Sequence, residues 1–135
     1  MISDLKGGIV KTHFDLNVWQ ESIKLVKEIY SITTKFPQNE VFGLTSQIKR
    51  AVVSVPSNIA EGASRQTNRE FIQFLYIAIG SLSEVETQLI IAKELNFIKH
   101  KDIQISLENI INIKKMINGL IKYLKAKNEK QYTNY

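Results

Sequence analysis

Cysteine is absent from this sequence, and proline and histidine are scarce. The 135 residues include no cysteine, two prolines and two histidines. Without thiols the chain cannot form disulfide bonds, thiolate zinc sites or iron–sulfur clusters, and it cannot use a cysteine nucleophile. Two prolines and six glycines also disfavour collagen, low-complexity segments and disordered chains.

Long apolar runs are missing as well. The longest strongly apolar stretch without charge runs from Phe71 to Ser83, which is 13 residues, whereas a helix needs about 20 to cross a bilayer. The segment MISDLKGGIVK has no basic region followed by an apolar region and a cleavage site, so a secretory signal is not expected. We therefore expect a cytoplasmic protein without a membrane span. With 44% hydrophobic residues, 135 residues suffice for one domain with one core.

Apolar residues recur at spacings of three and four in four separate stretches, which is the period of one helix face. No strand pair, hairpin turn or internal repeat competes with this period. Short connections between four helices predict an all-α fold, an antiparallel up-down four-helix bundle. The expected segments are a flexible arm at 1–14, a bundle at 15–127 with helices at about 15–35, 43–61, 67–96 and 101–126, and a polar tail at 128–135.

Local signals predict several helix boundaries. Asp15 is a suitable N-cap for the first helix, and Thr67 and Glu70 form a capping-box pattern at the start of the third. Gly62 predicts an end of the second helix near residue 61, because glycine takes the left-handed C-terminal conformation at low cost. Inside that helix, Pro56 lacks an amide donor and its ring clashes with the preceding turn, which predicts a bend nearby.

The excess positive charge lies in the C-terminal part of the chain. Residues 1–98 hold 10 basic and 10 acidic side chains, and residues 99–135 hold 8 basic and 3 acidic ones, so the net charges are 0 and +5. Four lysines of the last helix fall within an arc of about 100° beside its apolar stripe. Such a face attracts phosphates, or else it is an ordinary solvated surface. The candidate nucleic-acid contacts are Lys114, Lys115, Lys122 and Lys125, with Arg65 and Arg69 at the junction of the second and third helices.

The last helix also carries more apolar surface than one bundle stripe requires. Ile105, Ile111, Ile113 and Met116 are predicted to lie away from the central seam. Self-association would bury this wide apolar arc, and irregular packing within one chain is the alternative.

Polar side chains form a second series on the second and third helices. If these faces meet inside the bundle or at a subunit junction, Arg50 is placed to make a bidentate ion pair with Glu84. A polar ligand site at Arg50, Asn58 and Glu61 is the alternative. Gly80 and its serine neighbour predict a close approach of two helices. The predicted structural network comprises Gln47, Arg50, Ser54, Asn58, Glu61, Ser81, Glu84 and Gln88.

Catalytic and metal-binding patterns are missing from the sequence. The di-iron sites of four-helix bundles need Glu-x-x-His pairs, and neither His13 nor His100 has a glutamate three positions earlier. No Gly-rich phosphate loop, H-E-x-x-H or G-x-S-x-G motif occurs. We therefore expect no catalytic residue, no metal site and no cofactor, and a protein that is not an enzyme.

Three strings of the sequence carry a resemblance to one known family. They are DLNVWQESIKLVKEIY at 15–30, GLTSQIKRAVVSVPSNIAEGASR at 43–65 and EFIQFLYIAIGSLSEVETQLIIA at 70–92. Through them the chain resembles the bacterial four-helix-bundle family encoded in intervening sequences of 23S ribosomal RNA genes, whose members are often labelled ribosomal proteins. It is also similar to the accessory protein of diversity-generating retroelements, a basic pentameric bundle that binds nucleic acid and the reverse transcriptase.

This resemblance implies a homo-oligomer, a ring-shaped pentamer, and it transfers no catalytic activity. The sequence departs mildly from the family pattern, with Lys49 where arginine is frequent and Val55 where isoleucine is frequent. Its last helix matches by character more than by letters. The residues that match are Arg50, Ser54, Pro56, Ser57, Asn58, Glu61, Gly62, Arg65, Ser81, Glu84, Glu86, Thr87 and Gln88.

The basic last helix and the resemblance together favour a non-enzymatic oligomeric bundle that contacts RNA or DNA backbone without strong sequence specificity. The alternative is a protein-interaction scaffold with no nucleic-acid role, in which the positive charge serves solubility or an acidic protein partner.

Overall fold

Helices account for the secondary structure of the described chain. The computed structural model describes His13 and residues 16–133, and side chains through residue 128. In chain order, α1 spans Asn17–Thr33, the short 3₁₀ helix η3 spans Gln38–Glu40, α2 spans Leu44–Ala63, α3 spans Asn68–Glu94 and α4 spans His100–Thr133. No strand occurs in these residues, so the predicted all-α class is confirmed. Apart from His13, the predicted arm at 1–14 lies outside the described residues, as does Asp15.

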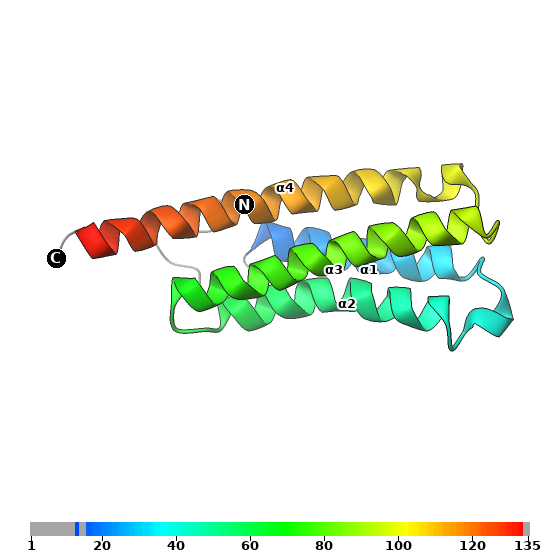
Figure 1. The fold of residues 1–135 in the computed structure, drawn as a ribbon, viewed down its shortest axis with the longest axis horizontal. Helices are drawn as coiled ribbons and strands as arrows, with labels where there is room; N and C mark the ends of the chain where they lie inside the picture. The colour runs from blue at the N-terminus through cyan, green and yellow to red at the C-terminus, as the bar shows by residue number, and fades with distance from the viewer. Residues whose placement is uncertain (1–12, 14–15, 134–135) are drawn as a thin grey trace.

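Successive long helices run in opposite directions (Figure 1). α1 packs against α2 and α4, and α3 packs against the same two helices, so the four helices close around one core as an up-down bundle. The C-terminal part of α4 extends beyond the ends of the other helices (Figure 1). Because α4 continues to Thr133, it reaches into the segment expected to be a polar tail.

One continuous apolar core holds the bundle together, and all four helices contribute to it. Isoleucine and leucine dominate this core, as the three-and-four spacing of the sequence predicts. The largest fully buried side chains are Leu16, Leu25, Ile29, Ile48, Ile59, Leu75, Leu82, Leu89, Ile103, Ile110, Ile117 and Leu120.

The turn between α2 and α3 tests two of the predicted boundaries. Thr67 is confirmed as the N-cap of α3, because its hydroxyl accepts a hydrogen bond from the Glu70 amide at 3.2 Å. Of the predicted box, the Glu70 carboxylate accepts from the Thr67 hydroxyl at 2.9 Å and not from the Thr67 amide. α2 ends at Ala63, two residues beyond the predicted end near residue 61, but Gly62 is buried inside the helix and does not terminate it. A Cβ built on Gly62 would lie 2.7 Å from the Cβ of Phe74. Close packing of α2 on α3, and not a left-handed turn, therefore explains this glycine.

Two interactions fix the opposite end of the bundle. Asn96 has a φ of 63°, and the amides of Asn96 and Phe97 donate to the carbonyls of Lys93 and Ala92, which is the Schellman pattern that ends a helix. After this turn, the Asp102 carboxylate accepts hydrogen bonds from the Lys99 amide at 2.9 Å and from the Lys35 ammonium at 2.8 Å. The second contact ties the segment after α1 to the first turn of α4.

Pro56 and Leu16 are two positions where the helices depart from simple expectation. α2 continues without interruption from Leu44 to Ala63 with Pro56 inside it, and the bend near Pro56 stays a prediction. At the start of α1 the N-cap position is Leu16, whose side chain makes no capping hydrogen bond. Its side chain is fully buried instead, so packing and not capping secures this end of α1.

By length and apolar content alone, α3 qualifies as a helix that could cross a membrane. One face of α3 nevertheless packs in the shared core through Leu75, Leu82 and Leu89. A core helix of a bundle meets the same two criteria, so this property does not distinguish the two roles.

Candidate functional site

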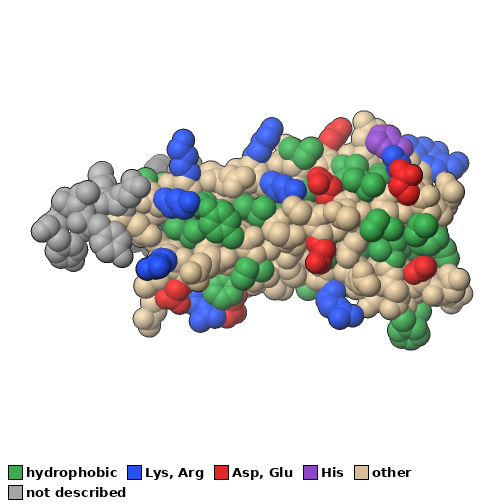
Figure 2. All heavy atoms as spheres, viewed as in Figure 1, with side chains coloured by type: hydrophobic (Ala, Val, Ile, Leu, Met, Phe, Trp, Pro, Cys, Tyr) green, Lys and Arg blue, Asp and Glu red, His purple; other side chains and the backbone are tan. Residues whose placement is uncertain are grey.

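Four lysines of α4 form the lysine row, which comprises Lys114, Lys115, Lys122 and Lys125. The adjoining face of α4 is buried through residues such as Ile110, Ile117 and Leu120, which leaves the row beside it at the molecular surface. In Figure 2, Lys and Arg side chains gather over the C-terminal half of α4 and alternate with hydrophobic side chains.

Acidic neighbours do not neutralise the lysine row evenly. The ammonium of Lys114 lies 3.8 Å from the Glu86 carboxylate of α3, and this lysine is partly buried. Lys115, Lys122 and Lys125 are exposed and form no ion pair with any residue of the described chain. Three of the four lysines of the row therefore remain uncompensated cations.

The end of the row adjoins an aromatic ring of α3. The Lys125 ammonium donates a hydrogen bond to the Tyr76 hydroxyl at 2.9 Å and lies 5.5 Å from the centre of that ring. A hollow of about 490 Å³ opens here, and both residues and Lys122 line it. The row thus ends beside a half-exposed tyrosine that the sequence analysis did not select.

Arg65 and Arg69 lie at the α2–α3 end of the bundle, the end toward which the C-terminal half of α4 runs (Figure 1). A guanidinium nitrogen of Arg65 lies 2.7 Å from the Glu61 carboxylate, and the guanidinium lies 4.9 Å from the centre of the Phe74 ring. Arg69 is exposed and forms no ion pair with the described residues. Arg65 is therefore a weaker candidate for phosphate binding than Arg69.

The predicted polar network forms only in part. Ser54 of α2 and Ser81 of α3 share a short hydrogen bond between their hydroxyls, and the Asn58 amide donates to the Ser54 carbonyl at 2.8 Å. The predicted Arg50–Glu84 ion pair does not form within one chain. Arg50 donates instead to the Ser46 hydroxyl at 3.0 Å, and Glu84 is exposed. Serine hydroxyls fit the narrow α2–α3 seam better than a long guanidinium does.

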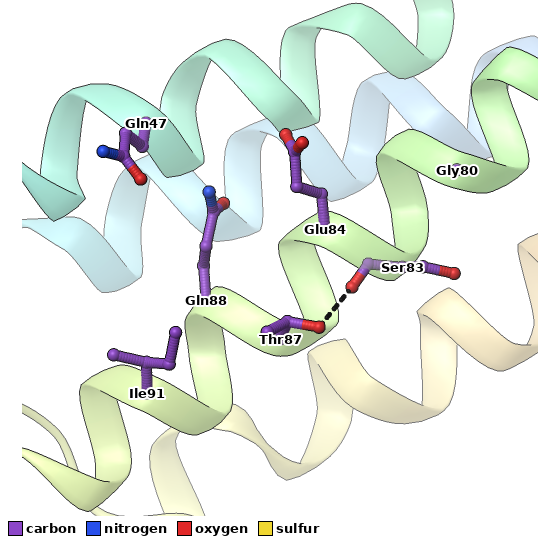
Figure 3. Close-up of a pocket in the computed structure, with 7 residues that line it drawn as sticks. All are labelled: Gln47, Gly80, Ser83, Glu84, Thr87, Gln88 and Ile91. Carbon is purple, nitrogen blue, oxygen red and sulfur yellow. Dashed lines mark hydrogen bonds between the residues drawn. The ribbon is translucent and has the colours of Figure 1, made fainter.

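Three of the predicted network residues, Gln47, Glu84 and Gln88, line a second hollow of about 550 Å³ along α3. Gln88 and Glu84 point from α3 toward α2, where Gln47 lies (Figure 3). Gln88 is only 8% exposed, and its carbonyl oxygen has no hydrogen-bond partner. Gly80 also lines this hollow, and a Cβ built on it would meet nothing within 4 Å. The close helix approach predicted for this small-residue patch therefore occurs at Ser81, which meets Ser54 of α2, and not at Gly80 itself. The alternative ligand residues Arg50, Asn58 and Glu61 do not line this hollow.

A polar contact between α1 and α4 escaped the sequence analysis. The Glu28 carboxylate accepts hydrogen bonds from the Ser106 hydroxyl at 2.9 Å and from the Asn109 amide at 2.9 and 3.0 Å. Ser106 is 3% exposed. The three-residue spacing of Ser106 and Asn109 was the available signal, because it places them on one helix face. Nothing in the sequence indicated that Glu28 would face them.

The exposed apolar surface of α4 is smaller than the sequence predicts. Ile105 and Ile111 are exposed, at 68% and 48%. Ile113 is 2% exposed and belongs to the core, so its predicted position away from the seam is wrong. Met116 is partly buried against the same core. The buried arc of α4 is therefore wider than the predicted stripe, because α4 packs against both α1 and α3.

In the part of the chain that the structure describes, no group of three His, Asp or Glu side chains is placed to hold a metal ion. His13 makes an edge contact with Trp19, with ring centres 5.1 Å apart. His100 is exposed at the first position of α4.

Comparison with known proteins gives one family match. The family model described as 23S rRNA-intervening sequence protein matches residues 14–119. No curated protein matches the chain. The family match includes all of α1, α2 and α3 but ends inside α4, so Lys122 and Lys125 lie beyond it.

Proposed function

Because the chain belongs to the family of 23S rRNA-intervening sequence proteins, we propose that it is a non-enzymatic, self-associating helical bundle that binds the backbone of RNA or DNA. Binding proceeds without strong sequence specificity, since phosphates carry no sequence information. The observation that carries this proposal is the set of three uncompensated cations, Lys115, Lys122 and Lys125, on the exposed face of α4.

The spacing of these cations suits an extended polyanion. Lys115 and Lys122 are seven positions apart, which is about 10 Å along a helix axis, so they reach different phosphates. Each phosphate that a lysine neutralises releases condensed counterions, and this release drives binding at low salt. The Lys114 ammonium contributes less because Glu86 lies beside it.

Self-association is included in the proposal because one apolar patch of α3 lacks a cover. Ile77 and Ile91 are exposed, and the hollow at Gly80 and Gln88 lies on the same helix. A second copy seated there would bury this apolar surface and bring a donor to the unpartnered Gln88 oxygen. Repeated copies would multiply the weak contribution of each lysine row. The resemblance implies five copies, and light scattering of the purified protein measures the number.

A salt series on matched variants tests nucleic-acid binding. The test variant carries Lys115→Gln, Lys122→Gln and Lys125→Gln, and the control carries Lys24→Gln, Lys27→Gln and Lys49→Gln on α1 and α2. Each triple changes the formal net charge from +5 to +2. The test variant should lose affinity for a labelled duplex, and its slope of log affinity against log salt should shrink by about one per lysine. The control should bind as the wild type does.

Two results would reject this function: no binding of nucleic acid at low salt, or equal losses in the two variants. The protein-interaction scaffold is the second candidate, and the exposed apolar residues of α3 favour it. Capture of partners from the native cell with and without nuclease separates the two functions. Partners retained after nuclease favour the scaffold, and partners lost after nuclease favour binding through RNA or DNA.

A further inference from the structure

The hollow at the end of the lysine row combines an aromatic ring, two ammonium groups and an amide. It lies between α3 and α4, has a volume of about 490 Å³ and is lined by Tyr76, Asn118, Ile121, Lys122, Lys125 and Ala126. Volumes of about 300 to 1,000 Å³ are typical of sites for small organic ligands. A hollow of this size therefore admits one nucleotide.

The Tyr76 ring is open to a stacking partner. Tyr76 is 49% exposed. The Lys125 ammonium lies 2.9 Å from the Tyr76 hydroxyl and 5.5 Å from the ring centre. The difference between these two distances is close to the distance from the ring centre to the hydroxyl oxygen, so the three points lie nearly on one line. The ammonium therefore lies toward the hydroxyl edge of the ring and does not cover its face.

The two lysines of the hollow are available to an anion. Lys122 and Lys125 are exposed, and neither pairs with an acidic side chain of the described residues. Hydrogen bonding to the Tyr76 hydroxyl holds the Lys125 ammonium beside the ring. A base stacked on that ring would thus have two cations within reach of its phosphates, and the exposed Asn118 amide supplies a donor and an acceptor for a base edge.

We infer that this hollow binds one unpaired nucleotide of a nucleic-acid strand, with the base on Tyr76 and the flanking phosphates on Lys122 and Lys125. A base inside a duplex is already stacked and paired, so only an unpaired strand supplies the ligand. The inference rests on the proposed function, because it assigns the ligand class of the same lysine row.

Tyr30 of α1 provides a matched control outside the lysine row. It is also half-exposed, and Lys49 lies near it, with the ammonium 4.8 Å from the ring centre. The described contacts include no hydrogen bond from Lys49 to the Tyr30 hydroxyl. Tyr30 lines a hollow of about 390 Å³ with Lys49 and Arg50, and this hollow includes no lysine of the row. Tyr30→Leu therefore tests whether any half-exposed tyrosine beside cations would serve equally well.

Fluorescence anisotropy with a labelled single strand and its fully paired duplex tests the inference, in both RNA and DNA forms. The duplex has the higher charge density, so a purely electrostatic surface favours the duplex. The wild type should instead prefer the single strand. Tyr76→Leu should weaken single-strand binding by about 5-fold to 150-fold, the range for losing one stacked base, and leave duplex binding unchanged. Tyr76→Phe keeps the ring and should lose less single-strand affinity than Tyr76→Leu, since it lacks only the hydroxyl that holds Lys125. Tyr30→Leu should bind the single strand as the wild type does.

A 2-aminopurine base in the single strand reports stacking directly through quenching of its fluorescence. Quenching should occur with the wild type and Tyr76→Phe, and should be absent with Tyr76→Leu. The inference is overturned if Tyr76→Leu quenches and binds like the wild type, or if Tyr30→Leu loses as much affinity. If the inference fails in this way, the proposed function is still supported when the variant lacking Lys115, Lys122 and Lys125 binds the duplex more weakly than the wild type does. Failure of the wild type to bind either probe rejects both.

Discussion

The Glu28 carboxylate of α1 accepts two hydrogen bonds from the Asn109 amide of α4, at 2.9 and 3.0 Å. The Ser106 hydroxyl donates a third at 2.9 Å. Together these contacts join the first and last helices of the bundle, where Ser106 is almost fully buried. They satisfy polar groups that the apolar core around them cannot satisfy, so they select one register of α4 against α1.

Replacing Glu28 by alanine should destabilise the fold. The Ser106 and Asn109 donors would lose their partner, and an unsatisfied buried polar group costs about 1 to 3 kcal/mol. The free energy of unfolding from urea titration measures this loss. Glu21→Ala is the control on the same helix, because Glu21 forms only an exposed pair with Lys24 at 3.1 Å, worth about 1 kcal/mol or less. Equal losses in the two variants would show that the α1–α4 contact has no special role.

Two glycines should respond in opposite ways to alanine. At Gly62 the new Cβ would lie 2.7 Å from the Cβ of Phe74 and 3.2 Å from the Phe71 carbonyl oxygen, and such overpacking costs about 1 to 3 kcal/mol. At Gly80 the Cβ meets nothing within 4 Å, so Gly80→Ala should gain about 1 kcal/mol from helix propensity alone. The free energy of unfolding of Gly80→Ala, measured by urea titration, should therefore be about 1 to 3 kcal/mol higher than that of Gly62→Ala. The reverse order would contradict the close α2–α3 packing.

These two glycines also show what the sequence could and could not predict. The apolar period gave the four helices, and the Thr67–Glu70 cap was predicted correctly because both partners lie within one turn. The role of Gly62 was predicted wrongly. Glycine occurs both at helix ends and where two helices pack closely, and which role applies here depends on Phe74 of another helix. Periodicity assigns a residue to a helix face but does not fix the rotation of that helix in the bundle.

The candidate site shows the same limit. The sequence predicted the lysine row, because four cations on one helix can be placed on a wheel without knowing their neighbours. It did not predict that Glu86 would lie beside Lys114 or that Tyr76 would lie beside Lys125. In the polar network, the seam between α2 and α3 was predicted, but Ser54 and Ser81 meet there and Arg50 and Glu84 do not. Contacts between helices depend on their relative rotation and sliding, which no single stretch of sequence encodes.

The last prediction concerns acid stability at the joint between α1 and α4. The Asp102 carboxylate accepts hydrogen bonds from the Lys35 ammonium and from the Lys99 amide. These two donors hold the pKa of Asp102 below its ordinary value of 3.8. Since the folded state favours the ionised form, Asp102 stabilises the fold at pH values above 3.8. This contribution is lost as the pH falls through the lowered pKa of the folded state.

Asp102→Asn removes the charge but keeps an oxygen that accepts from the Lys99 amide. The melting temperature of the variant should lie below that of the wild type at neutral pH, and the gap should close as the pH falls below 3.8. Thermal unfolding of both proteins across the acid range measures the gap. Glu108→Gln removes the same charge from an exposed position of α4, and its gap should be smaller. A gap for Asp102→Asn that stays constant through the acid range would show that the Lys35 contact does not depend on ionised Asp102.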